Sequence, residues 1–199
     1  MLAVLTGLGL SAAAGLNAYI PLLVVGVLGR YTDLVRLPAE FDWLANGWVL
    51  GALALLLAAE VILDKVPVVD TVNDAIQTVV RPAAGGAVFA ATDAAARLDS
   101  SSFMQDNPWI GWALGIMVAL VVHVTKATVR PVVNAGTLGT GAPVVSTVED
   151  TVSLGMSLLA ILVPVVALVV LALLAYLALR MLRAAHRRRR RRATGSAAT

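Results

Sequence analysis

Three stretches of the chain carry no charged side chain and approach or exceed the length of a membrane span: residues 1–29, 43–59 and 151–179. A helix rises 1.5 Å per residue, so it needs about 20 predominantly apolar residues to cross the hydrocarbon core of a bilayer. Within that core the backbone polar groups must be satisfied inside the segment, which a helix achieves. These stretches therefore predict an all-α polytopic membrane protein.

Two further segments extend this pattern to about five transmembrane helices. Residues 108–131 form an apolar run that ends in cations, whereas residues 71–96 are less apolar and are expected to form a weak span or a re-entrant helix. The Gly-rich segment 134–141 is too short for a span, so we expect a re-entrant or outer loop there. The prediction is a single membrane domain, residues 1–180, with spans at 1–29, 43–65, 71–96, 108–131 and 150–180.

Charge is distributed unevenly between this domain and the C-terminal tail, residues 181–199, which we expect to be disordered. From Arg180 onward the chain has eight arginines and no acidic residue. The positive-inside rule places the tail and the loops at 30–42 and 97–107 on the cytoplasmic side of a bacterial cytoplasmic (inner) membrane. The tail is expected to bind anionic lipid and no nucleic acid. The arginines expected to make this contact are Arg187, Arg188, Arg189, Arg190, Arg191 and Arg192.

An eight-residue motif occurs twice and indicates an internal repeat. Residues 67–74 read PVVDTVND and residues 143–150 read PVVSTVED, with six of eight positions identical. Each copy follows a span led by tryptophan and precedes another helix. With five spans both copies lie on one face, which is a parallel repeat of the kind found in some transporters. Chance similarity is the alternative, because Pro, Val and Thr are common in this sequence.

Charged residues inside the expected spans are spaced so that they share helical faces. Glu60 and Asp64 lie four residues apart, and His123, Lys126 and Arg130 follow at spacings of three and four. Charges within a membrane are costly and usually face a partner or a wet cavity. We therefore expect the acidic face and the basic face to meet. The alternative is that these charges lie at the headgroup level and cap helix ends.

A second polar stripe follows the first copy of the motif and has a counterpart in the second copy. Together the two stripes predict a polar vestibule that opens to the outer side. No catalytic residue is assigned. The candidates for ligand binding or coupling are Asn17, Glu60, Asp64, Lys65, Asp70, Asp74, Arg81, His123, Lys126, Arg130, Asn134, Glu149 and Asp150.

Metal and cofactor chemistry receives little support. The chain has no cysteine, which excludes disulfides and thiolate metal sites. Asp70 and Asp74 are weak candidates for a Mg²⁺ site on a phosphate-bearing lipid. Acid pairs at this spacing are common at the starts of helices, because the positive end of the helix dipole stabilises acidic side chains there. No cofactor is therefore predicted.

Four short motifs occur in an order that matches a known family: Gly15-Leu16-Asn17-Ala18-Tyr19, Asp64-Lys65-Val66-Pro67, Arg81-Pro82-Ala83-Ala84-Gly85 and His123-x-x-Lys126-Ala127. On these motifs the chain resembles a bacterial integral-membrane family catalogued as domain of unknown function 4126. The resemblance implies a membrane protein and brings no activity with it.

The charge pattern predicts a small transporter, or a lipid- or solute-binding translocation protein, with its site between the two repeats. Mixed charges favour a zwitterionic or anionic ligand, or proton-coupled gating through an acid and His123. A protomer of this size favours a homodimer. One alternative is a membrane enzyme that acts on a phospholipid or polyprenyl phosphate. Another is a non-catalytic scaffold or assembly factor, in which the charges only hold helices together.

Overall fold

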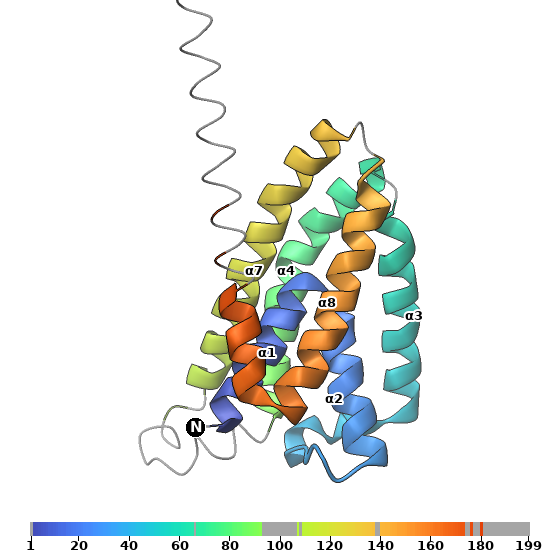
Figure 1. Cartoon of the computed structure of the whole chain (residues 1–199). Helices are drawn as coiled ribbons and strands as arrows, with labels where there is room; N and C mark the ends of the chain where they lie inside the picture. The colour runs from blue at the N-terminus through green and yellow to red at the C-terminus, as the bar shows by residue number, and fades with distance from the viewer. Residues whose placement is uncertain are drawn as a thin grey trace, which may run out of the picture.

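The computed structural model of the chain is all-helical over the residues that it describes (Figure 1). These are residues 2–65, 67–92, 107, 109–137, 140–173, 176 and 180, apart from the side chains of residues 3, 67–72, 132, 134 and 135. The tail arginines at positions 187–192 lie outside the described residues, and so does the loop at 97–106.

Four long helices form an antiparallel bundle. They are α3 (Gly47–Leu63), α4 (Pro67–Ala91), α7 (Trp109–Gly136) and α8 (Ala142–Leu162). In Figure 1, α3 and α7 rise while α4 and α8 descend. Both copies of the repeated motif therefore begin a descending helix at the same end of the bundle. A proline stands at the start of each, where its missing N–H costs no helical hydrogen bond.

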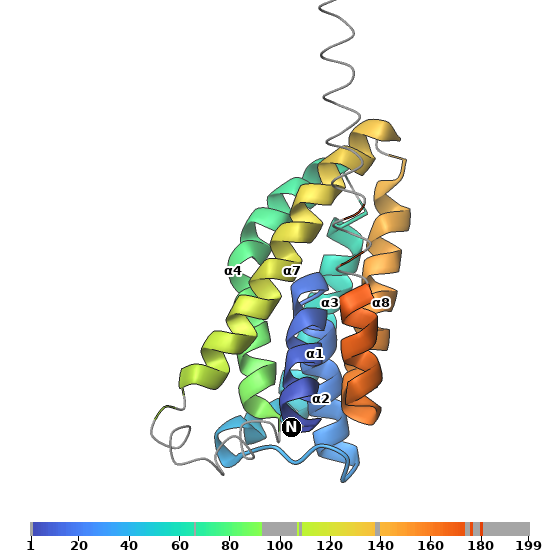
Figure 2. The ribbon, with the colours of Figure 1, turned by 60° about the vertical axis from the view of Figure 1, so that its left-hand side comes forward.

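The span expected over residues 1–29 is divided into two short helices, α1 (Leu2–Leu16) and α2 (Tyr19–Tyr31). The chain enters and leaves this pair at the same end of the bundle, and the tip at Asn17 lies about halfway along it (Figures 1 and 2). At 1.5 Å per residue, 15 residues extend about 22 Å, which is less than the ~30 Å hydrocarbon core of a bilayer. A short 3-10 helix, η1 (Ala39–Ala45), then leads into α3.

The stretch expected to span at 150–180 is also divided. Helix α8 ends at Leu162, and a separate helix at 164–173 turns back along α1 toward the opposite end of the bundle (Figure 2). Pro164 favours this break because proline disfavours helical backbone at the preceding residue, and Val163, with φ −143° and ψ 73°, lies outside the helical region. The tail lies outside the described residues, so its expected place on the side of the loop at 30–42 stays a prediction.

Within the part of the chain that the structure describes, two helices are long and apolar enough to cross a membrane: Trp109–Pro131 within α7 and Ala142–Leu162. A third is added if η1 and α3, which meet at 63°, are counted as one bent span. Helix α4 has the length, but it carries Asp70, Asp74 and Arg81. The connection from α7 to α8 is shorter than the expected loop at 134–141, because α7 continues to Gly136.

Large apolar side chains are exposed on the outside of the bundle, while charged side chains are buried inside it beside an apolar core. Leu55 is 73% exposed and Val79 is 74% exposed, whereas Arg81 is fully buried. Helix α3 illustrates this pattern, since its buried residues are Leu50 and the acidic Glu60. An apolar surface of this extent needs a partner or a lipid environment.

Glycine allows α4 and α7 to pack closely. A Cβ atom on Gly85 would lie 2.8 Å from the carbonyl oxygen of Gly115, and one on Gly86 would lie 2.8 Å from the Trp112 ring. Small residues at such crossings bring helix backbones together, the means by which helices associate within a bilayer. This contact sets the separation of the two helices that carry most of the charged groups described below.

Candidate functional site

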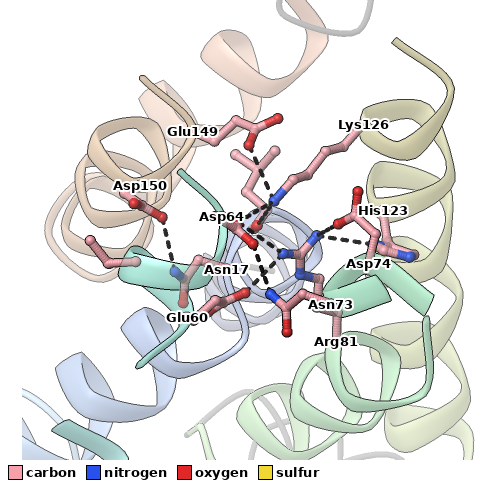
Figure 3. A network of polar contacts seen from close by, with 12 residues as sticks. Asn17, Glu60, Asp64, Asn73, Asp74, Arg81, His123, Lys126, Glu149 and Asp150 are labelled. Atoms are coloured by element: carbon pink, nitrogen blue, oxygen red, sulfur yellow. Dashed lines mark hydrogen bonds and ion pairs between the residues drawn. The ribbon is translucent and has the colours of Figure 1, made fainter. Parts of the chain in front are cut away.

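Among the described residues, seven ion-paired side chains lie together between α3, α4, α7 and α8, and Figure 3 shows all of them except Arg130. We call this set the charged network, and its members are Glu60, Asp64, Asp74, Arg81, Lys126, Arg130 and Glu149. The acidic face of α3 and the basic face of α7, which helical spacing predicted to meet, do so here. Five of these side chains are buried, Asp74 and Glu149 are partly exposed, and the acids and cations contact one another. The polar vestibule expected from the stripes stays a prediction.

Asp64 is the centre of the charged network. It stands immediately after α3 and contacts all three cations, with its Oδ2 3.0 Å from Arg130, 3.6 Å from Lys126 and 3.7 Å from Arg81. Its Oδ1 accepts a hydrogen bond of 2.7 Å from Asn73. Helix α7 of the second half of the chain and helix α4 of the first half therefore converge on a single carboxylate.

Arg81 extends the network toward α3. Its guanidinium donates to Glu60 at 2.8 Å and lies 3.4 Å from Asp74, and the side chain is fully buried. Glu60 therefore pairs with a cation of α4 rather than with Lys126. Fully buried ion pairs lose their hydration, so each member depends strongly on its partner.

His123 borders the network, and its partners define its proton position. The guanidinium of Arg81 lies 3.1 Å from Nδ1 and can only donate, so Nδ1 must be an unprotonated acceptor. Nε2 then carries the hydrogen and faces the hydroxyl of Thr78 at 3.0 Å, which itself donates to the Asp74 carbonyl. His123 is thus a neutral, hydrogen-bonded residue in this arrangement, and the acids are the better candidates for proton exchange.

Lys126 connects the network to the α1–α2 tip. Its ammonium group donates to the carbonyl oxygen of Leu16, the last residue of α1, at 2.9 Å. It also lies 3.2 Å from Glu149 and 3.6 Å from Asp64. An ammonium group has three hydrogens, and three acceptors surround this one. Glu149 in turn pairs with Arg130.

Asn17 closes the tip of the hairpin. Its Oδ1 accepts from the backbone N–H of Tyr19 at 3.0 Å and of Ile20 at 3.2 Å, and its Nδ2 donates to Asp150 at 2.9 Å. The side chain satisfies the first donors of α2, as N-cap residues do. Asn17 is fully buried, as its expected place in the interior of the bundle requires.

We expect Asn17→Ala to cost more stability than Asn46→Ala, the matched change at the exposed N-cap of α3. The side-chain oxygen of Asn46 accepts one hydrogen bond among the described residues, from the backbone N–H of Trp48. Removing this side chain should therefore lower stability by about 1 kcal/mol. Loss of Asn17 also leaves Asp150 without its amide donor, so about 2 kcal/mol is expected, the upper end of cap measurements. Thermal unfolding of the purified variants in detergent measures both, and equal costs would contradict the role of Asn17 at the tip.

The charged network has more acids than cations. Among the side chains that the structure describes, four carboxylates, from Glu60, Asp64, Asp74 and Glu149, face three cations, so one negative charge is in excess when all groups are ionised. An isolated buried charge is strongly unfavourable, and such groups tend to become neutral instead. The network therefore has the composition of a site that can hold one proton or one added positive charge.

Several buried polar atoms lack a hydrogen-bond partner among the described residues. They include Oε2 of Glu60, Oε1 of Gln77, Nε of Arg81 and Oγ of Ser146. Buried polar atoms are nearly always paired, so each exception calls for an explanation. Glu60 is notable because its other oxygen binds Arg81, which leaves Oε2 as the atom that can take up a proton.

A cavity of about 290 Å³ lies beside the network, between α7 and α8, with α1 as its floor. Its walls are apolar except at one end, where Lys126 and Glu149 contribute to the lining. Figure 2 shows the helices diverging from their shared turn with α1 between them. The volume is near the lower end of ligand pockets, which span about 300–1,000 Å³.

The structure assembles most of the candidates that the sequence identified, with three exceptions. The ammonium group of Lys65 donates to the Val61 carbonyl of its own helix, so it caps α3. The side chains of Asp70 and Asn134 lie outside the described part of the chain. Asp74, the other weak metal candidate, has its carboxylate between two guanidinium groups.

Asn73 and Thr78 belong to the site but were not among the candidates. The repeat contained a signal for Asn73, because it occupies the position that Glu149 holds in the second copy. Both residues reach the network, Asn73 through Asp64. No sequence pattern indicates a role for Thr78. Its place in the site follows only from its contact with His123 in the structure.

Comparison with known proteins gives one match. A family model described as a domain of unknown function, DUF4126, matches residues 4–184. No curated protein and no solved structure matches the chain.

Proposed function

Because this chain belongs to the DUF4126 family, whose model covers all but the ends of the sequence, we propose a function from the geometry of its site. The protein is a small integral membrane protein that moves an amphiphilic ligand across the bilayer, and the charged network is its proton-coupled site. The observation that carries this proposal is the excess carboxylate of a buried network, beside a cavity between α7 and α8.

The arrangement of helices supports a translocation protein. In this proposal α3, α4, α7 and α8 cross the membrane, and the α1–α2 pair enters and leaves at one face. The rising pair α3 and α7 and the descending pair α4 and α8 are consistent with the parallel repeat. Short helices that end within the bundle beside a charged site are a recurrent feature of transporters.

Proton coupling requires a group that can be neutral or ionised at modest cost. Glu60 meets this requirement, because its protonation brings the network to three acids and three cations. The charged and titratable groups facing it are Arg81 of α4, Lys126 of α7 and the nearby Asp64. Glu60→Gln imitates the protonated form, so the variant should fold as well as the wild type and lose coupling.

The test is lipid movement in proteoliposomes that contain the full chain and a fluorescent NBD-labelled phosphatidylethanolamine. Dithionite bleaches only the outer leaflet, so movement appears as loss of the protected inner-leaflet signal. We expect the wild type to expose the inner-leaflet probe, faster under a proton gradient. We expect Glu60→Gln and Lys126→Met to abolish this activity, and Glu40→Gln, an exposed acid in η1, to retain it.

A wild type that leaves the inner-leaflet probe protected under both conditions would overturn the proposal. Full activity in both Glu60→Gln and Lys126→Met would remove the network from the mechanism.

A scaffold or assembly role is the alternative that the extent of ion pairing favours. A purely structural network predicts that each variant loses function in proportion to its loss of stability. Translocation instead predicts that Glu60→Gln is inactive while its unfolding temperature is unchanged. Measuring both quantities on the same preparation separates the two.

A further inference from the structure

We propose that the cavity between α7 and α8 binds the acyl chain of an aminophospholipid, whose ammonium headgroup contacts Glu149. This inference rests on the proposed function and names the class of its ligand. Two observations on the cavity carry it: the direction in which it changes from polar to apolar, and the hydrogen-bonding capacity left at its polar end.

The polarity of the cavity follows the axis of the helices. Lys126 and Glu149 line its polar end, on the side of the shared turn, where α7 ends at Gly136 and α8 begins at Ala142. Val129 and Val148 of the lining lie nearer that turn. Val152 and Met156 line the wall farther along α8, and Ala12 of α1 forms part of the floor. A membrane amphiphile has the same order, with its headgroup near the interface and its chain toward the middle of the bilayer.

The cavity is accessible from the side of the bundle. Val121 and Val148 border it on opposite helices and are 65% and 55% exposed. Their side chains face the surroundings of the bundle, which the outer apolar surface assigns to lipid. A chain can therefore enter between α7 and α8 without passing through water, and it replaces contacts with other lipid chains by contacts with the walls.

The polar end offers acceptors rather than donors. The three hydrogens of the Lys126 ammonium group already face Leu16, Asp64 and Glu149. Among the described residues, three donor groups contact the Glu149 carboxylate: Nε and one terminal nitrogen of Arg130, and Nζ of Lys126. Their shorter contacts are on Oε2, and the contact given for Oε1 is 3.4 Å from Arg130 Nε. Carboxylate oxygens can accept about four hydrogen bonds in all. The incoming headgroup thus meets spare acceptor capacity.

Charge complementarity selects a cationic headgroup. The described part of the charged network already has one carboxylate in excess, so a headgroup whose only charge is its phosphate would add repulsion and find no donor on Lys126. A primary ammonium group would supply both the missing positive charge and N–H donors for Glu149. A quaternary ammonium group supplies the charge without the donors, so phosphatidylcholine should bind less well than phosphatidylethanolamine.

The test is lipid binding by native mass spectrometry of the full chain, using phosphatidylethanolamine, phosphatidylcholine and phosphatidylglycerol with identical acyl chains. We expect phosphatidylethanolamine to be preferred over phosphatidylglycerol about tenfold, which corresponds to about 1.4 kcal/mol. Glu149→Gln should remove this preference while chain binding persists. Val121→Trp, which fills the cavity, should weaken binding of all three lipids, and Val124→Trp, on an exposed face of α7 outside the cavity, should not.

Equal binding of the three lipids by the wild type, or a preference for phosphatidylglycerol, would overturn the headgroup assignment. Unchanged binding in Val121→Trp would overturn the cavity as the site. The binding assay involves no lipid movement, so its outcome is separate from that of the liposome experiment. Selective binding without movement would overturn only the proposed function, and movement that ignores the headgroup would overturn only this inference.

Discussion

Arg81→Met should lower the free energy of unfolding by about 3–5 kcal/mol, the cost of removing one partner from a buried ion pair. Arg81 is the largest fully buried side chain among the described residues. Its loss leaves Glu60 without its closest cation and raises the excess of carboxylates in the charged network from one to two. Titration of the purified protein with a denaturing detergent, followed by tryptophan fluorescence, measures the effect.

The double variant Glu60→Gln/Arg81→Met provides the internal control for this prediction. It removes both members of the pair at once and returns the network to one excess carboxylate, so it should recover a large part of the lost stability. Arg30→Met is the control for a mere loss of charge, because Arg30 is exposed and donates to the Ala45 carbonyl. A double variant as unstable as Arg81→Met would contradict the pairing energetics described for Glu60.

Gly115→Leu should prevent the normal packing of α4 against α7. A Cβ at this position would overlap the carbonyl group of Gly85 and lie 2.8 Å from Cβ of Phe89. The Gly85 carbonyl is a backbone group, so it can move away from the new side chain only if the two helices separate. Overpacking typically costs about 1–3 kcal/mol, and we expect Gly115→Ala to reach the upper part of that range and Gly115→Leu to exceed it.

The matched control for Gly115 is Gly155→Ala in α8, where a Cβ meets nothing within 4 Å. That change should be neutral or stabilising by up to about 1 kcal/mol, because alanine is the better helix former. The same detergent titration compares the variants. Wild-type stability in Gly115→Leu would show that the close approach of α4 and α7 does not hold the bundle together.

The spacing of charges predicted the site more accurately than hydropathy predicted the spans. Residues four apart on a helix share a face whatever the helix packs against, so Asp64 could be matched with Lys126 and Arg130 from the sequence alone. The specific pairing of Glu60 with Arg81 could not, because it depends on how far α3 and α4 are rotated about their axes. Such rotations follow from packing at glycines such as Gly85, whose partners lie far away in the sequence.

Hydropathy failed where a break within an apolar stretch reverses the chain. Uncharged runs at 1–29 and 151–179 have the composition of single spans, yet each contains a break, at Asn17 and at Val163. The polar Asn17 and the Pro164 that follows Val163 were visible as kink signals. A kink and a reversal look alike in sequence, however, because the difference lies in whether a tertiary partner, such as Asp150 for Asn17, satisfies the freed groups.

The break between α1 and α2 has an electrostatic consequence of its own. Aligned peptide dipoles give a helix about half a negative charge at its C-terminus and half a positive charge at its N-terminus. At the hairpin tip the negative end of α1 faces the Lys126 ammonium group, and the positive end of α2 is joined through Asn17 to Asp150. The backbone thus acts as two opposite fractional charges held a few residues apart. Any movement of the tip would move both fractional charges together. Lipid binding beside Lys126 and the ionisation of Asp150 should therefore both depend on the position of this short segment.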